Sequence, residues 1–150
     1  MAKFVLDTNV LIDALNLPAQ LEALLGFLGW ALPSTFLSAV VLHEIAAGAS
    51  TPRQRALLDQ QITGPFARRG RVFAPSSEAW HQAGHLIQQG HPVSTPGGLS
   101  DLLLAVSSRE AGLTVITNDR DFRRLTRVVR GLAAVAPFPT QSSGRSNREE

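Results

Sequence analysis

Apolar segments of this chain end at, or are interrupted by, a carboxylate in four places, and this pattern limits the possible folds. The four are Asp7 after residues 3–6, Glu44 within 39–46, Asp101 before 102–106 and Asp119 after 113–116. An isolated ionised carboxylate is costly to bury, so it normally takes up a proton or finds a partner. The chain has only 12 acidic residues, so four in apolar surroundings indicate a specific arrangement. If the fold gathers them, their repulsion requires a cation, and oxygen ligands favour a divalent metal.

Short apolar runs alternate with longer segments of helical periodicity. Strands are predicted at 3–7, 33–37, 71–74, 113–117 and 132–136. Helices are predicted around 10–15, from Pro18 through Leu28, at 39–48, from Pro52 to Gly64-Pro65, at 77–90, at 99–112 and at 118–130. Ser38 and Ser76 are suitable N-caps, whereas Gly64-Pro65 should interrupt or end its helix. Residues 91–98 are predicted to form a loop.

This alternation predicts an α/β fold, with a parallel sheet covered by helices on both faces. We expect one domain over residues 1–137 and a disordered polar tail over 138–150. Ligands of such sheets bind beyond the carboxyl ends of the strands. Asp7 and Asp119 follow predicted strands, and the other two acids lie on helices near such ends. The sequence therefore predicts one acidic pocket.

The composition indicates where the protein works. It has no cysteine, which excludes disulfides and thiolate metal sites and fits a reducing cytoplasm. No apolar run is long enough to cross a bilayer, and Asp7 interrupts the first one too early for a signal peptide. We therefore expect a cytoplasmic protein with no membrane association.

The basic residues are almost all arginine. Of 14 lysines and arginines only Lys3 is a lysine, and arginine favours bidentate contact with phosphate. A coding bias would explain the same composition equally well. Four arginines should share one helix face just after Asp119; they are Arg120, Arg123, Arg124 and Arg127. A solvated face is the simpler reading, but the nearby acids favour binding of phosphate groups.

Each acid also has a purely structural explanation. Asp7 can cap a helix, Asp101 can sit favourably in a first helical turn, and Asp119 can belong to a turn. Glu44 can point to solvent. Asp121 is either a fifth ligand or, as we favour, an ion-pair partner of Arg120 or Arg124.

Two histidines have the spacing of a zinc pair. His81 and His85 are four positions apart, but no third ligand is evident, so a helix surface is the better reading.

With these residues identified, the chain resembles the PIN-domain ribonucleases, most closely the VapC-type toxins of type II toxin–antitoxin pairs. The resemblance covers about residues 1–137 and is carried by four motifs, at 5–11, at Ser38 with Glu44, at 99–105 and at 115–122. It implies a three-layer α/β/α sandwich in which Asp7, Glu44, Asp101 and Asp119 are the catalytic residues and bind Mg²⁺ or Mn²⁺. It further implies auxiliary roles for Thr8, Asn9 and Thr117.

The resemblance implies a metal-dependent endoribonuclease, a cognate antitoxin and a homodimer. Accessible bases make single-stranded RNA the expected substrate. A PIN-fold nuclease of RNA processing and a non-catalytic nucleic-acid-binding module remain alternatives. A haloacid dehalogenase-type phosphatase would need an aspartate where Asn9 stands, and it would need a suitably placed lysine. A phosphate-accepting receiver domain would need a lysine near its last strand, where none occurs.

Overall fold

The computed structural model describes residues 2–90 and 98–141, which form a five-stranded parallel sheet. The strands are β1 (Phe4–Leu6), β2 (Thr35–Ser38), β3 (Val72–Phe73), β4 (Thr114–Ile116) and β5 (Ala133–Val135). Their order across the sheet is β3-β2-β1-β4-β5, so β1 lies at the centre. Val5 pairs with Phe36 on one side and with Val115 on the other.

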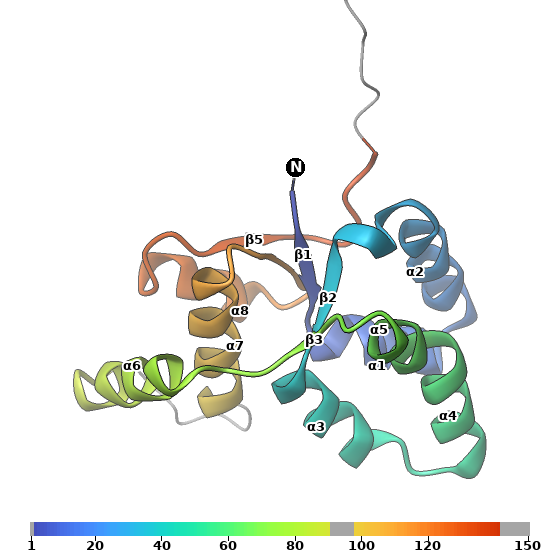
Figure 1. Ribbon diagram of the computed structural model, residues 1–150, viewed down its shortest axis with the longest axis horizontal. Helices are drawn as coiled ribbons and strands as arrows, with labels where there is room; N and C mark the ends of the chain where they lie inside the picture. The colour runs from blue at the N-terminus through green and yellow to red at the C-terminus, as the bar shows by residue number, and fades with distance from the viewer. Residues whose placement is uncertain (1, 91–97, 142–150) are drawn as a thin grey trace, which may run out of the picture.

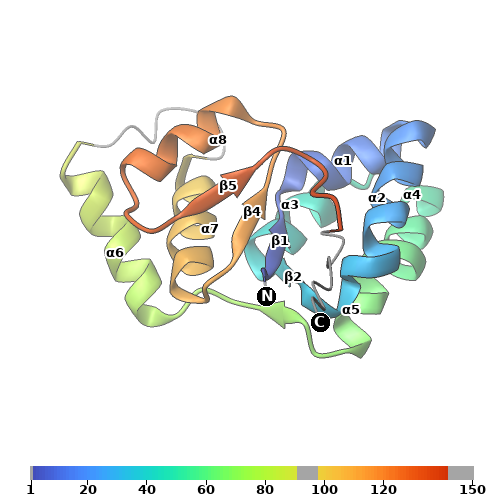
Figure 2. The same cartoon turned by 90° about the horizontal axis from the view of Figure 1, so that it is seen from above.

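Helices cover both faces of this sheet. They are α1 (Thr8–Asn16), α2 (Pro18–Ala31), α3 (Ala39–Gly48), α4 (Pro52–Leu57), α5 (Gly64–Arg68), α6 (Ser77–Gln88), α7 (Gly98–Glu110) and α8 (Arg120–Arg124). The first five lie on one side of the sheet and α6 to α8 lie on the other (Figures 1 and 2). The predicted α/β/α sandwich is confirmed. Within the described ranges, no helix is both long and apolar enough to span a membrane.

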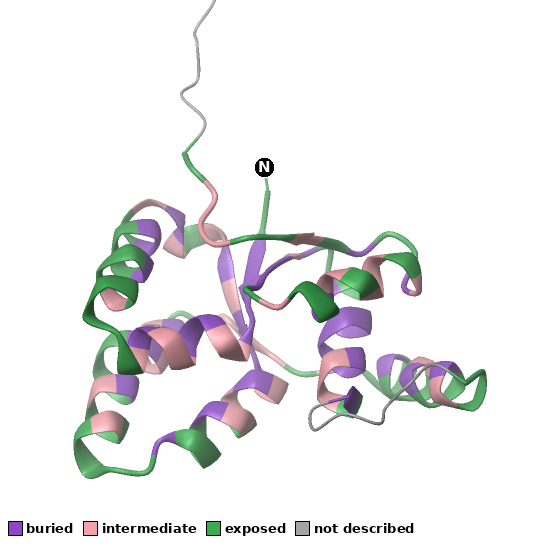
Figure 3. Cartoon of the chain, turned by 180° about the vertical axis from the view of Figure 1, so that it is seen from behind, coloured by how far each residue is buried: buried purple, intermediate pink, exposed green. Residues whose placement is uncertain are grey.

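The core centres on the two middle strands. Val5, Leu6, Val115 and Ile116 are fully buried, and buried residues concentrate along these strands (Figure 3). A parallel sheet covered on both faces needs continuous apolar strands instead of alternating ones, which explains why residues 4–6 and 115–116 are all apolar. The edge strand β5 is more exposed.

The helix that begins at Pro52 is interrupted at Gly64-Pro65, as predicted, but it does not end there. A π-helical segment, η2 (Leu58–Thr63), joins α4 to α5, and the Gly64 N–H donates to the Asp59 carbonyl. Pro65 has no N–H to give to the helix. A Cβ on Gly64 would lie 2.2 Å from the Asp59 carbonyl oxygen, so only glycine fits. The wider turn therefore accommodates both residues.

The predicted helix 118–130 is wrong in its extent. It consists of α8 followed by a 3₁₀ turn, η3 (Leu125–Arg127), and the chain then reverses at Gly131, where φ is +84°. The Thr126 hydroxyl donates to the Arg123 carbonyl at 2.7 Å. Such local bonds and the branched Val128 and Val129 disfavour continued α-helix.

The chain keeps packing against the core beyond the predicted boundary at residue 137. Phe138 stacks on Phe27 of α2, with ring centroids 5.3 Å apart. The predicted loop at 91–98 lies outside the described residues except for Gly98, which begins α7. Residues 142–150 of the predicted tail also lie outside them.

Candidate functional site

The sheet has a topological switch point between β1 and β4. After β1 the chain continues to β2 on one side, and after β4 it continues to β5 on the other. Connections that leave in opposite directions open a crevice at the carboxyl ends of the two strands, where ligands of α/β proteins bind. Asp7 and Thr117 are the first residues beyond these strands, and the Asp7 N–H donates to the Ile116 carbonyl at 2.9 Å.

Asp7 is 4% exposed and hydrogen-bonded through both carboxylate oxygens. Oδ1 accepts the Thr8 N–H at 2.7 Å, which caps α1. Oδ2 accepts from the Thr117 hydroxyl at 2.8 Å and from the Asn9 amide at 3.2 Å. The cap explains one oxygen only, so the other is available for a further role. Burial raises the pKa of Asp7, and these hydrogen bonds oppose that rise.

Thr117 connects the two strand ends. Its fully buried hydroxyl accepts the Asp119 N–H at 3.0 Å while it donates to Asp7. The Asp119 carboxylate in turn accepts the Asp121 N–H at 2.8 Å and caps α8. The side-chain oxygens of Thr117 and Asp119 thus each accept the backbone N–H two positions later, which fixes the turn between β4 and α8.

Two residues that we did not single out from the sequence support this site. Asn118 donates its N–H to the Asn9 side chain at 3.0 Å and its amide to the Asp13 carboxylate at 2.9 Å. Asp13 lies four positions after Asn9 and therefore one turn further along the same face of α1. This four-residue spacing from Asn9 was the signal in the sequence that could have identified Asp13. The two contacts fix the end of β4 to α1.

Glu44 belongs to α3, which begins at the Ser38 cap. Its side chain is half-buried and does not simply face solvent. Burial raises its pKa, the Asp7 charge raises it further, and the Thr8 hydroxyl and His43 act in the opposite direction. Thr8 thus lies beside Glu44 and Asp7, although its buried hydroxyl forms no hydrogen bond of ordinary geometry.

Asp101 lies in the first turn of α7 and faces the other three acids. Burial, followed by the charges of Asp7, Glu44 and Asp119, raises its pKa to about 7. Like charges produce such a rise only over short distances. The structure therefore brings the four predicted carboxylates into one electrostatic environment, although they are up to 112 positions apart in the sequence, from Asp7 to Asp119.

These four carboxylates, called the acidic site from here on, have the chemistry of a divalent-cation site. All the donors are oxygen atoms, as Mg²⁺ requires. Within residues 2–90 and 98–141 the one salt bridge joins Arg124 to Asp121, so no basic side chain forms a salt bridge with the four carboxylates. As the side chains stand in these ranges, no three Asp, Glu or His residues are arranged so that they could hold a metal ion together. The unpaired Thr8 hydroxyl adds a further polar atom. By its chemistry, a set of oxygen donors of this kind fits a hydrated magnesium or manganese ion.

Asp121, the four predicted arginines and the two histidines are not part of the acidic site. Asp121 pairs with Arg124 at 3.1 Å, and both side chains are strongly exposed. The continuous helix face predicted for the arginines does not form, because α8 ends at residue 124. Arg120, Arg124 and Arg127 are exposed, while the Arg123 Nε is enclosed without a hydrogen-bond partner. His81 and His85 are exposed on α6, as expected of a helix surface.

Comparisons with known proteins agree with this architecture. A family model described as PIN domain matches residues 4–128. The DNA-bound VapBC from Salmonella typhimurium is 24% identical in sequence, with a TM-score of 0.67. The match covers 91% of this chain and 98% of the Salmonella chain. VapBC2 from Rickettsia felis, bound to a promoter DNA fragment, is 21% identical, with coverages of 89% and 97% and a TM-score of 0.64. FitAcB from Neisseria gonorrhoeae is 22% identical, with coverages of 87% and 95% and a TM-score of 0.63. No curated protein sequence matches significantly.

Proposed function

This chain belongs to the PIN domain family, and on that premise we propose that it is a metal-dependent endoribonuclease, the toxin of a toxin–antitoxin pair. The observation that carries the proposal is the acidic site at the switch point, where burial, followed by the charges of Asp7, Glu44 and Asp119, raises the pKa of Asp101 to about 7. A protein pays a stability cost for such a concentration of charge, and a bound cation gives the arrangement a purpose.

Three carboxylates would hold a magnesium or manganese ion, namely Asp7, Asp101 and Asp119, while Glu44 would hold a coordinated water or a second ion. When bound, the ion polarises a phosphate and makes water a stronger nucleophile. Thr117 and Asn9 are positioning residues, since their hydrogen bonds orient the Asp7 carboxylate. Thr8 presents its hydroxyl beside Glu44. Water adds to the RNA phosphodiester and the O3′–P bond breaks, which leaves 5′-phosphate and 3′-hydroxyl ends.

The RNA backbone would lie along exposed arginines. Arg120, Arg124 and Arg127 follow Asp119 directly and are exposed. Guanidinium groups bind phosphates in bidentate fashion, so affinity for RNA should fall with salt. Arg123 has only part of its side chain available for such a contact.

The toxin assignment would require partners for this chain. The similar complexes from Salmonella, Rickettsia and Klebsiella are VapBC or toxin–antitoxin assemblies, which supports a cognate antitoxin here. Large exposed apolar side chains would serve protein contacts. Leu17 is 51% exposed and Leu25 of α2 is 40% exposed, which suits a homodimer or an antitoxin contact. Such a protein would act in the cytoplasm, where its RNA substrates are.

The experiment is cleavage of total cellular RNA by the purified protein, with magnesium, with manganese or with EDTA. We expect cleavage with either metal, none with EDTA, and none for Asp7→Asn or Asp101→Asn. The matched control is Asp59→Asn, the same change at an exposed position of η2. Full activity of either site variant would overturn the proposed site. RNA binding without cleavage would favour a nucleic-acid-binding module.

A further inference from the structure

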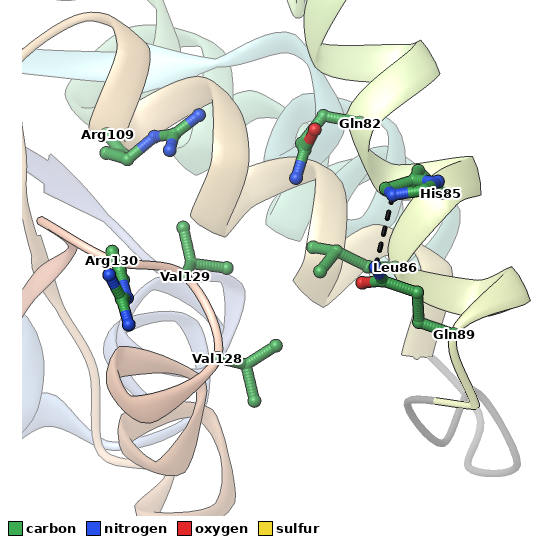
Figure 4. Close-up of a pocket in the computed structure, with 8 residues that line it drawn as sticks. All are labelled: Gln82, His85, Leu86, Gln89, Arg109, Val128, Val129 and Arg130. Carbon is green, nitrogen blue, oxygen red and sulfur yellow. Dashed lines mark hydrogen bonds between the residues drawn. The ribbon is translucent and has the colours of Figure 1, made fainter.

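A cavity of about 410 Å³ opens between α6, the end of α7 and the turn before β5. None of the four carboxylates of the acidic site lines it. Three of its polar residues come from one side of α6; they are Gln82, His85 and Gln89. Arg109 and Arg130 face them across the opening (Figure 4).

The charge of this cavity is entirely positive. No acid lines it, and neither Arg109 nor Arg130 has a carboxylate within 4.0 Å in the described part of the chain. The stem of Arg109 lies over Gly131, where a Cβ would be 3.7 Å from Cγ of the arginine. The positive φ of Gly131 makes the reversal that places Arg130 beside Arg109. Two guanidinium groups are thus held at one rim of the cavity.

The rest of the lining is apolar or neutral and polar. Leu86, Val128 and Val129 supply the apolar part of the lining, although Leu86 and Val129 are buried and present only a small surface to the cavity. Gln82 and Gln89 add amides that both donate and accept hydrogen bonds. The Gln89 amide lies 3.1 Å from the His85 ring nitrogen, so its direction is partly fixed. Guanidinium groups, amides and an apolar wall together match the phosphate, base edge and base face of a nucleotide.

The cavity is connected to the acidic site by two elements. Asp101 and Arg109 lie eight positions apart on α7, which separates them by about 12 Å along the helix axis. The segment from Asp119 to Arg130 also begins at the acidic site and ends at the cavity. An extended RNA strand that occupies the acidic site can therefore reach the cavity with a neighbouring nucleotide.

We propose that this cavity binds one nucleotide of a single-stranded RNA, with its phosphate on Arg109 and Arg130 and its base against Leu86, Val128 and Val129. The proposal rests on the proposed function, since it assigns part of the RNA path. Only an unpaired base can turn its face and edge into such a cavity, which excludes a duplex.

The test measures fluorescence anisotropy of a labelled single-stranded oligoribonucleotide in EDTA, which stops metal-dependent cleavage. The variant is Arg109→Gln with Arg130→Gln, at two exposed positions. The matched control is Arg53→Gln with Arg55→Gln on α4, which lies on the opposite side of the molecule (Figure 1). We expect the cavity variant to bind about tenfold more weakly. Its slope of log affinity against log salt should be smaller by about 0.7, the value for the one phosphate contact that is lost.

A second arm uses uridine monophosphate and follows the ring protons of His85 by NMR, in the wild type and in Gln82→Ala. We expect weak binding of the free nucleotide that shifts the His85 signals, and much tighter binding of the oligonucleotide. Equal affinity for both would overturn the RNA assignment in favour of a free nucleotide.

The two proposals fail differently. If the wild type cleaves RNA and the cavity variant binds it with unchanged affinity and salt slope, only the cavity assignment is overturned. If RNA binds through the cavity but is not cleaved with magnesium, the cavity assignment stands and the nuclease proposal fails. Absence of RNA binding by the wild type would overturn both.

Discussion

Replacing Asp101 by asparagine should stabilise the metal-free protein while it abolishes the proposed activity. The carboxylate is half-buried on α7, and burial together with three neighbouring acids raises its pKa from 3.8 to about 7. Asparagine keeps the shape and carries no charge, so it removes this repulsion. A site residue whose loss improves folding is expected where function is built at the expense of stability.

The size of the effect follows from the pKa. At 1.36 kcal/mol for each pH unit, a rise from 3.8 to about 7 corresponds to about 4 kcal/mol. The group is in partial contact with water, which screens the charge, so we reduce this to about 2 kcal/mol. For a chain of this length that raises the melting temperature by about 4–8 °C.

The pH dependence has a definite sign. Below about pH 4 the Asp101 carboxyl is protonated in the folded and the unfolded chain, and the charge costs nothing. Between about pH 4 and pH 7 the unfolded chain ionises first, so wild-type stability falls as pH rises. Above pH 7 the full penalty applies. The advantage of Asp101→Asn should therefore be absent at pH 4 and largest at pH 8.

Thermal unfolding followed by circular dichroism at pH 4, 6 and 8 measures this difference, in EDTA and in magnesium. Bound magnesium should stabilise the wild type, because the ion balances the negative charge of the four carboxylates. It should have little effect on the variant, which lacks the Asp101 carboxylate. A variant that is less stable than the wild type in EDTA at pH 8, or whose advantage does not change with pH, would refute the reasoning.

Three further predictions concern single contacts. Gly64→Ala should lower the free energy of unfolding in urea by about 3 kcal/mol, since its Cβ would lie 2.2 Å from the Asp59 carbonyl oxygen. Gly84→Ala on α6, with open space around it, should raise that free energy by about 0.5–1 kcal/mol. Equal effects of the two changes would contradict the role of the π-helical turn. Thr117→Val should reduce RNA cleavage at least about tenfold because Asp7 loses its 2.8 Å donor, and Thr117→Ser should retain most of it; equal rates for the two variants would show that the hydroxyl is unimportant. Phe138→Ala should destabilise the fold by about 1 kcal/mol through loss of the stacked ring, measured by the same unfolding assay, and no change would place the domain boundary at residue 137.

The sequence predicted the parallel sheet well because its strands depend on local patterns. A buried parallel strand needs a short apolar run, and its end needs a polar cap, so positions 4–7 and 114–119 could be read directly. Glu44 was recognisable as the one acid of an apolar helix. The order of the strands, which creates the switch point, was not predicted, because local propensity does not determine which strands are neighbours.

The remaining features depend on contacts distant in sequence. The spacing of Asp13 from Asn9 places both on one helix face, but nothing in the sequence pairs Asp13 with Asn118, 105 positions away. The π-helical turn depends on how Gly64 and Pro65 share one helix, where the sequence pattern predicted only an interruption. The early end of α8 arises from Thr126 and the packing of Val129, whereas the arginine spacing had suggested a longer helix.

The hydrogen bonds of Asp7 have a consequence for how variants of this protein are chosen. One oxygen starts α1 and the other faces the acidic site, so most replacements at Asp7 remove a helix cap together with a site carboxylate. An inactive Asp7→Ala protein would therefore leave misfolding and lost chemistry indistinguishable. Asp101 carries no such structural duty. For an inactive but well-folded form, to be expressed in a living host or used to trap bound RNA, Asp101 should be replaced and Asp7 left intact.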